Sequence, residues 1–209
     1  MGGGFDDAAR HRFAVTLGAI LAGGLSSRMG TDKAFVEVAG RPMVDWVAAA
    51  LGDVARPLVI VGRSSMPGFR ALPDPVEAPV GPLAGVTAAL AEATRTGTDA
   101  VVAVAVDQPF LRRETLRRLV ATFAGTAVVP VAEGARQVTC AVYPAAWYAA
   151  ASRELSGSGS IQSLLDRMTP RLVEAREWRG WGEDGASWFS VDDPAALAVG
   201  LERFGSVLE

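Results

Sequence analysis

Residues 15–33 have the sequence VTLGAILAGGLSSRMGTDK, in which an apolar segment runs into a glycine-rich loop that carries two cations. The apolar part, Val15 to Leu21, predicts a β-strand. Glycine has no Cβ atom, so backbone N–H groups in the loop can approach a polyanion closely, and Arg28 and Lys33 add positive charge. The stretch therefore predicts a strand followed by a phosphate-binding loop, with a nucleotide as the natural ligand.

Two common phosphate-binding motifs do not fit this loop. Lys33 is neither preceded by glycine nor followed by serine or threonine, and the glycines do not have the spacing of the dinucleotide fingerprint. These departures disfavour a P-loop ATPase and an NAD-dependent enzyme. A plain strand-to-helix turn is the structural alternative, but such a turn requires one or two glycines and no cations at fixed positions.

Beyond the loop, short apolar runs alternate with helical patterns, which indicates a mostly parallel sheet flanked by helices. The run Ala100–Val106 is apolar at every position, as expected of a central parallel strand covered on both faces. We therefore predict an α/β three-layer sandwich. The other expected strands are Leu58–Val61, Ala127–Val131, Val138–Tyr143 and Arg171–Ala175, and the expected helices are Pro42–Leu51, Gly81–Ala93, Arg113–Phe123, Pro144–Glu154, Ser160–Met168 and Pro194–Phe204.

Composition favours one soluble globular domain, since 50% of the 209 residues are hydrophobic and 21% are charged. We assign this domain to residues 13–209 and expect a disordered tail at 1–12. A net charge of -3 provides no basic surface for DNA or RNA. No apolar run has the length of a membrane helix, and the start lacks the basic and apolar regions of a signal peptide, so we expect a cytoplasmic protein without a membrane contact.

The chain has a single cysteine and a single histidine. Cys140 lies in an apolar alternating run and is expected in the core, so neither a disulfide nor a cysteine-rich zinc site is predicted. His11 lies in the polar N-terminal tail, which disfavours Ser-His-Asp and Cys-His catalysis and histidine-ligated metals. The chemistry is therefore expected to depend on carboxylates, cations and a hard metal ion.

Two aspartates are the candidates for that metal ion. Asp107 follows the predicted central strand, at the edge where open α/β sheets bind ligands, and Mg²⁺ is commonly held by one or two carboxylates together with substrate phosphates. A helix-capping role is the alternative for Asp107. Asp193-Pro194 forms a good helix start, which leaves Asp192 to face the site. A second carboxylate would strengthen Mg²⁺ binding and repel an anionic acceptor that the metal does not screen.

Four segments in this order resemble the molybdenum cofactor guanylyltransferases and related nucleotidyltransferases. Residues 21–33 match the pattern LAGGxSxRMGxDK, and residues 81–85 (GPLAG), 106–111 (VDQPFL) and 189–194 (FSVDDP) follow it. The resemblance covers residues 15–204. It implies the Rossmann-like fold of nucleotide-diphospho-sugar transferases, Mg²⁺ as cofactor, and transfer of GMP from GTP to the phosphate of molybdopterin with release of pyrophosphate.

The same resemblance implies the roles of individual residues. Arg28, Lys33 and Asp107 would be catalytic, and Asp107 and Asp192 would bind the metal. The nucleotide would be bound by Leu21, Ala22, Gly23, Gly24, Lys33, Asp74, Gly81, Pro82, Leu83 and Asp107. Without the resemblance, Asp74 would be interpreted as a structural residue, because it lies in a Pro-Asp-Pro turn. Gln137 and Tyr143 would contact the second substrate, whereas Trp178, Trp181 and Trp188 are expected to pack.

One departure from the family and two alternative functions follow from these residues. The family typically carries asparagines where this chain has Ser190 and Asp192, which affects the assignment of the substrate. The first alternative is a sister enzyme that uses CTP or another phosphorylated acceptor. The second is a nucleotide-binding module without turnover, such as a chaperone for a cofactor. We expect a monomer that binds GTP and a molybdopterin-type acceptor, with transient contacts to cofactor-biosynthesis or acceptor enzymes.

Overall fold

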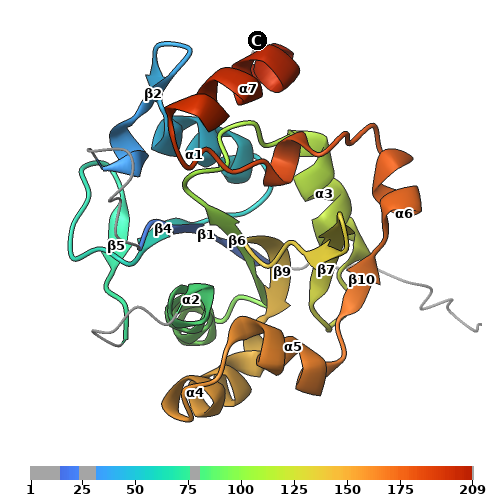
Figure 1. Cartoon of the computed structure of the whole chain (residues 1–209). Coiled ribbons are helices and arrows are strands. Elements are labelled where there is room, and N and C mark those ends of the chain that lie inside the picture. The colour runs from blue at the N-terminus through green and yellow to red at the C-terminus, as the bar shows by residue number, and fades with distance from the viewer. Residues whose placement is uncertain (1–14, 24–31, 76–80, 209) are drawn as a thin grey trace, which may run out of the picture.

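A computed structural model describes residues 15–23, 32–75 and 81–208, and its centre is an eight-stranded sheet. The strands of this sheet are β1 (Thr16–Leu21), β4 (Leu58–Val61), β5 (Arg70–Leu72), β6 (Ala100–Ala105), β7 (Val128–Ala132), β8 (Ala135–Arg136), β9 (Cys140–Pro144) and β10 (Arg171–Val173). Their order is β10-β7-β9-β6-β1-β4-β5, with β8 paired to β7 (Figure 1). The strands β5, β4, β1 and β6 are mutually parallel, while β9 runs antiparallel to β6 and β7.

Helices cover both faces of the sheet. On one face lie α1 (Met43–Gly52), α3 (Arg113–Thr122) and α6 (Ala175–Arg179), and on the other lie α2 (Pro82–Thr96), α4 (Tyr148–Ser156) and α5 (Ile161–Met168) (Figure 1). Successive strand residues alternate between the two cores, so Leu17 and Ala19 pack towards α2 while Ile20 packs towards α1. The predicted three-layer α/β sandwich is confirmed.

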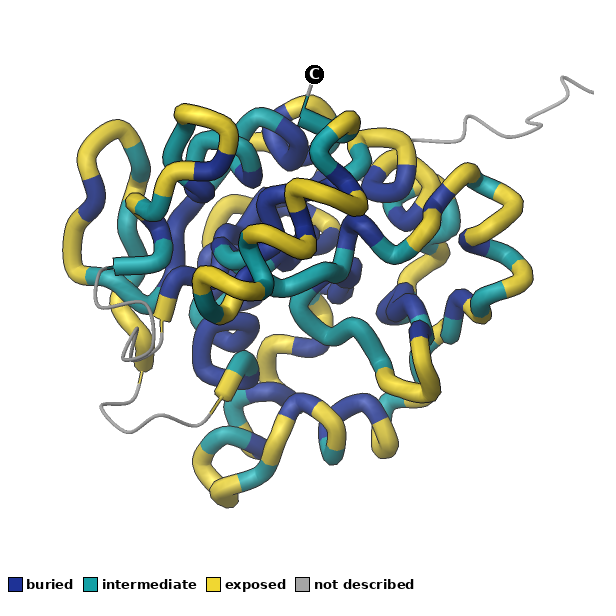
Figure 2. The backbone as a smooth tube through the Cα atoms, turned by 45° about the horizontal axis from the view of Figure 1, so that its top comes forward, coloured by how far each residue is buried: buried dark blue, intermediate teal, exposed yellow. Residues whose placement is uncertain are grey.

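A smaller apolar cluster joins the C-terminal helix to the first part of the chain. Helix α7 (Pro194–Phe204) contributes Phe204, which packs with Met43 of α1 and Val38 of the hairpin formed by β2 (Glu37–Val38) and β3 (Arg41–Pro42). Short 3-10 helices complete the fold: η1 (Lys33–Phe35), η2 (Ala145–Trp147), η3 (Ala186–Trp188) and η4 (Gly205–Leu208). Figure 2 shows buried chain in the interior of the molecule, with exposed segments in front of it and around it.

Several predicted boundaries differ from the structure. Helix α1 begins at Met43 because Pro42 is extended (φ -54°, ψ 141°) and belongs to β3, a hairpin that the sequence analysis missed. Strand β9 continues through Pro144, and a 3-10 turn delays α4 to Tyr148. The strand expected to reach Ala175 ends at Val173, since Ala175 begins helix α6.

Cys140 is fully buried within the sheet, and this burial raises the pKa of its thiol, as expected of a core residue. The expected tail at 1–12 lies outside the described residues. Across the ranges that the structure covers, the helices are too short or too polar to traverse a lipid bilayer.

Candidate functional site

Four parallel strands end at the same edge of the sheet. In the register of these strands, Leu21 pairs with Val61 on one side and with Ala105 on the other, and Val61 pairs with Leu72. Hydrogen bonds continue this alignment past the strand ends, because the backbone N–H of Ala22 donates to Val61 (2.8 Å) and that of Val106 donates to Leu21 (3.0 Å). Gly23, Gly62, Asp74 and Asp107 therefore follow neighbouring strands at the edge where α/β sheets bind ligands.

Gly23 and Gly62 approach each other closely at this edge. Gly62 has a φ of +88°, and a Cβ atom built on it would lie 2.4 Å from the backbone N and Cα of Gly23. A Cβ atom on Gly23 would lie 2.8 Å from Oδ2 of Asp74. Only glycine fits at both positions, so the start of the glycine-rich loop lies directly against the end of β4 and the Asp74 carboxylate.

Asp74 is exposed as a residue, yet its carboxylate end packs against the two glycines. This partial burial raises the pKa of the Asp74 carboxyl above its ordinary value. The rise is explained by the packing of the carboxylate itself, although other atoms of the residue are exposed. The side chain thus lies beside the loop, as its predicted nucleotide contact requires.

The first turn of α2 completes this side of the site. The helix starts at Pro82, after Gly81 and before the buried Leu83. A Cβ atom on Gly85 would lie 3.1 Å from Leu21 Cδ2 and 4.0 Å from Asp74 Oδ1, so the turn faces the same loop. The first amides of a helix lack intrahelical partners and form the positive end of its dipole, which favours an anion here.

Lys33 joins two carboxylates from distant parts of the chain. Its Nζ atom lies 3.1 Å from Oδ2 of Asp107 and 2.5 Å from Oδ1 of Asp192. Burial lowers the pKa of Lys33, but the hydrogen bond to Asp192 and the charge of Asp107 outweigh that effect and hold the pKa above its ordinary value. A positively charged ammonium therefore lies where Asp107 and Asp192 converge.

This carboxylate pair suits a hard divalent cation. Oδ1 of Asp107 is buried and has no hydrogen-bond partner within the described part of the chain, which leaves a carboxylate oxygen with unused lone pairs. Groups of three or more His, Cys, Asp or Glu that could hold a metal are absent from the same residues. Two carboxylates together with substrate phosphates are a normal ligand set for Mg²⁺, so the residues fit that ion.

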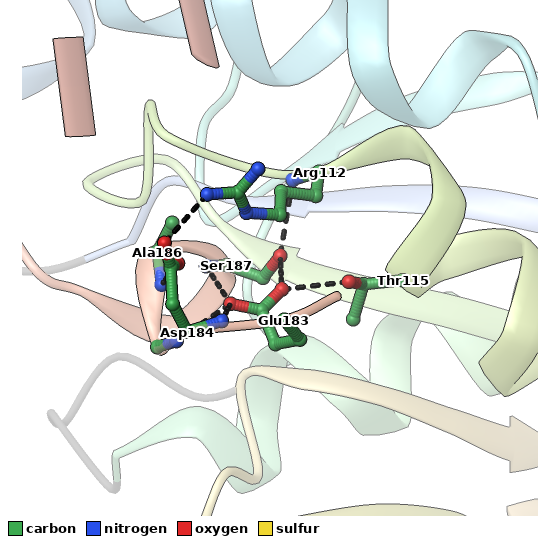
Figure 3. A network of polar contacts seen from close by, with 7 residues as sticks. Arg112, Thr115, Glu183, Asp184, Ala186 and Ser187 are labelled. Atoms are coloured by element: carbon green, nitrogen blue, oxygen red, sulfur yellow. Dashed lines mark hydrogen bonds and ion pairs between the residues drawn. The ribbon is translucent and has the colours of Figure 1, made fainter. Parts of the chain in front are cut away.

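The segment that leads to Asp192 contains a buried network around Glu183 (Figure 3). Glu183 is 3% exposed and accepts five hydrogen bonds: from the hydroxyls of Thr115 (2.6 Å) and Ser187 (2.5 Å) and from the backbone N–H groups of Asp184, Gly185 and Ser187. The glycines at positions 180, 182 and 185 predict a surface loop here, and that prediction is wrong at Glu183, which is buried. A lone glutamate among glycines gives no periodic signal that would reveal its burial.

Further contacts connect this network to the edge of the sheet where the parallel strands end. Arg112 donates its backbone N–H to Ser187 Oγ (3.0 Å), and Phe189 packs edge-on against Phe110 with ring centroids 6.1 Å apart. The backbone N–H of Val191 then donates to the carbonyl of Asp107 (2.8 Å). That bond places Asp192 next to Asp107. As predicted, Asp193 caps α7, accepting the N–H of Ala196 at 2.8 Å.

Arg63 is a second residue that the sequence analysis missed. It follows Gly62 at the end of β4, and its guanidinium pairs with both carboxylate oxygens of Asp32, the residue before Lys33. The two residues are 31 positions apart, one at the start of η1 and the other after β4, so only the folded chain brings them together. An isolated arginine after a strand carries no local signal of such a contact.

The residues expected to contact the second substrate are only partly consistent with the structure. Tyr143 is fully buried and donates its hydroxyl to the carbonyl of Val138 (2.7 Å), so a role in substrate contact is wrong. Gln137 donates its amide to backbone carbonyls of Ala132 and Ala135. Trp178 packs edge-on against Trp188 at 5.1 Å, as expected of a packing residue.

Most of the predicted site residues share one edge of the sheet. Leu21, Ala22, Gly23 and Asp74 lie on one side with the start of α2, and Lys33, Asp107 and Asp192 lie together on the other. Gly24 and Arg28 fall outside the described residues.

Residues 18–172 match the family model of the MobA-like NTP transferase domain. The chain belongs to this family. A molybdenum cofactor guanylyltransferase of Cereibacter sphaeroides is 40% identical over 151 residues, which cover 67% of this chain and 78% of that protein. The family resemblance stated from the sequence is confirmed, and the protein is a nucleotidyltransferase.

Solved structures place the fold among the same enzymes. The molybdopterin-guanine dinucleotide biosynthesis protein A from Archaeoglobus fulgidus superposes with a TM-score of 0.76 at 25% identity, covering 91% of this chain and 99% of that one. The 2-C-methyl-D-erythritol 4-phosphate cytidylyltransferase from Thermus thermophilus shares the fold, with a TM-score of 0.65 at 18% identity over 90% of this chain and 96% of that one. The fold of this MobA-like NTP transferase is therefore the predicted nucleotidyltransferase fold.

Proposed function

We propose that this MobA-like NTP transferase transfers GMP from GTP to the phosphate of molybdopterin and releases pyrophosphate. Family membership and the guanylyltransferase name of the Cereibacter sphaeroides relative support the reaction. The observation that carries the proposal is the convergence of Lys33, Asp107 and Asp192 at the end of β6. This arrangement combines a fixed positive charge with a carboxylate pair at one point, as transfer between phosphates requires.

In the proposed reaction, an oxygen of the acceptor phosphate attacks the α-phosphate of GTP. A new P–O bond forms as the bond to the bridging oxygen of the β-phosphate breaks, and that oxygen leaves with pyrophosphate. Lys33 would stabilise negative charge on the phosphates, aided by Arg28, while the amide of Gly23 and the first turn of α2 would orient the triphosphate. The amide of Ala22 is already hydrogen-bonded to Val61, so only the position of Ala22 in the loop is proposed to matter. The protein acts by positioning and charge, without a covalent intermediate.

Asp107 and Asp192 are the residues proposed to hold Mg²⁺. The buried, unpartnered Oδ1 of Asp107 supports this assignment. When bound, Mg²⁺ would neutralise charge on the phosphates and act as a Lewis acid. Asp74, packed on Gly23, is proposed to contact the nucleotide on the other side of the loop.

CTP is the alternative nucleotide, because the cytidylyltransferase from Thermus thermophilus has the same fold. A binding module without turnover is less consistent with the site, since binding alone does not require both a partly buried carboxylate and an ammonium at the strand ends. We propose further that the protein acts as a cytoplasmic monomer with transient contacts to acceptor enzymes. Its only cysteine, the buried Cys140, suits a reducing compartment.

Calorimetric titration with GTP, CTP, ATP and UTP in the presence of Mg²⁺ tests the proposal. We expect preferential binding of GTP, and we expect Asp107→Ala and Lys33→Ala to abolish it. Asp166→Ala is the control and should retain it, because Asp166 is a surface carboxylate of helix α5 that pairs with Arg136. Pyrophosphate release should then require both GTP and molybdopterin. A preference for CTP would assign a sister enzyme, and binding without pyrophosphate release would assign a non-catalytic module.

A further inference from the structure

Lys33 is the only lysine in the chain, while the other cationic side chains are arginines. It lies within the short 3-10 helix η1, where the carboxylate of Asp32 accepts a hydrogen bond from the N–H of Ala34 at 3.1 Å. This cap closes a turn around Lys33 and fixes the local backbone. The orientation of Lys33 towards the two carboxylates therefore depends on the contacts that hold Asp32 in place.

Arg63, at the end of β4, holds the Asp32 carboxylate in place. Both terminal nitrogens of its guanidinium pair with the two oxygens of Asp32, a bidentate arrangement that restricts distance and orientation together. Arg63 is 20% exposed at the side chain and Asp32 is 35% exposed, so the pair is shielded on most sides. The hydrogen bond from Arg63 lowers the pKa of Asp32 despite an opposing effect of burial, which keeps the carboxylate ionised.

We propose that Arg63 is a positioning residue that holds Asp32, and through it directs the Lys33 ammonium towards Asp107 and Asp192. The inference rests on the proposed function. It also assigns a task to Asp32 of the DK pair, which is to anchor the lysine rather than to bind metal or nucleotide. The anchoring contacts run from β4 through Arg63 and Asp32 to η1, and from Lys33 to the end of β6.

The charges argue against a direct role of Arg63 on phosphate. Asp32 accepts one hydrogen bond from each terminal nitrogen of the guanidinium and offsets its charge, and Nε is buried without a hydrogen-bond partner among the described residues. An arginine that binds phosphate presents its terminal nitrogens to the ligand. Arg63 presents them to Asp32.

A single-lysine protein allows a direct test, because reductive ¹³C-methylation gives one side-chain amine signal beside that of the N-terminus. We would compare the NMR spectra of the full chain with Arg63→Gln, Asp32→Asn and the double variant. Asp32→Asn keeps a good N-cap and removes the ion pair, so it tests the inference even where Arg63→Gln does not fold. Arg113→Gln is the matched control, because Arg113 forms an exposed pair with Asp53, with a separation of 3.2 Å.

We expect the Lys33 signal to narrow and move towards that of a solvent-exposed lysine in both single variants, and to stay unchanged in Arg113→Gln. The kcat should fall by about 10- to 100-fold, with a smaller change in the KM for GTP, as expected of a misaligned catalytic group. The double variant should be no worse than the single ones, because both remove the same pair.

An unchanged Lys33 signal in both single variants would overturn the inference. So would a loss of GTP affinity in Arg63→Gln alone, since that result would make Arg63 a direct phosphate ligand. The NMR signal does not depend on substrate identity. A wild-type protein that fails to turn over GTP would therefore contradict the proposed function, while the spectra would still decide the role of Arg63.

Discussion

Two halves of the site meet at Lys33 and are held in place in different ways. The strand-end half comprises Gly23, Gly62, Asp74 and Asp107, and backbone hydrogen bonds between parallel strands fix it. The C-terminal half, residues 183–192, has no strand and depends on the side chain of Glu183 and on a backbone bond from Val191 to Asp107. We infer that the first half tolerates most substitutions outside its glycines and acids, whereas the second depends on one buried carboxylate.

The largest expected contrast is between the two acidic residues that contact Lys33. Asp107→Asn should lower kcat by about 100-fold or more, because it removes preorganised charge at the reacting phosphates. Asp192→Asn should cost about 10-fold or less, because Asp192 is 51% exposed and the amide keeps one oxygen in place. Initial rates at saturating GTP and Mg²⁺ measure both. Equal losses would show that the two halves contribute alike.

The dependence of the C-terminal half on Glu183 is tested by stability. Glu183→Ala should lower the free energy of unfolding by about 3 kcal/mol, since it leaves buried donors without an acceptor. Asp184→Ala, at a neighbouring side chain that is 53% exposed, should change it by less than about 1 kcal/mol. Urea denaturation measures the difference. A similar, small effect of both substitutions would refute the view that Glu183 is the anchor.

Two glycines of the chain distinguish the effect of the close approach between Gly62 and Gly23 from the effect of backbone strain. Gly62 and Gly68 have φ values of +88° and +79°, but a Cβ atom on Gly68 meets nothing within 4 Å. Gly68→Ala should cost about 1 kcal/mol of backbone strain, and Gly62→Ala about 2 kcal/mol more because of the clash with Gly23. Thermal unfolding and nucleotide titration report the two costs. Nucleotide binding should weaken only in Gly62→Ala.

The smallest expected effect concerns Asp74. Partial burial raises its pKa in the folded protein, so the native state binds a proton more readily than the unfolded chain. This contribution to stability is therefore present at low pH and is lost as pH rises from the ordinary aspartate value through the raised one. Asp74→Asn should unfold at a slightly higher temperature than wild type near neutral pH. The corresponding gain in the free energy of unfolding should be less than about 1 kcal/mol, because the residue is exposed.

Calorimetric melting curves across pH would measure this difference, which should shrink below about pH 4, where Asp74 is protonated in both states. The same variant should bind GTP more weakly if Asp74 contacts the nucleotide. A melting difference that does not depend on pH would contradict the burial of this carboxylate and remove one feature that separates the two halves.

The strand-end half could be predicted well because its signals are local. Strand β4 and helix α7 have the predicted bounds, Leu58–Val61 and Pro194–Phe204. The run that is apolar on both faces identified the central strand, although β6 ends at Ala105 rather than Val106. Since Asp107 follows that strand, its place at the ligand-binding edge followed from the pattern alone. The catalytic and binding roles assigned to it and its neighbours remain predictions.

The three-layer fold and the residues at the strand ends could be predicted from the chain alone, because hydrophobic periodicity and glycine spacing act over a few neighbouring positions. The family followed from the resemblance of four short motifs. Three contacts became apparent only in the folded chain: Lys33 bridges Asp107 and Asp192, Arg63 pairs with Asp32, and Glu183 accepts hydrogen bonds that hold the segment leading to Asp192. Each of these contacts joins side chains that lie on different elements or in irregular loops. Their distances are set by strand order and by the packing of α3 and α7, which no local pattern encodes.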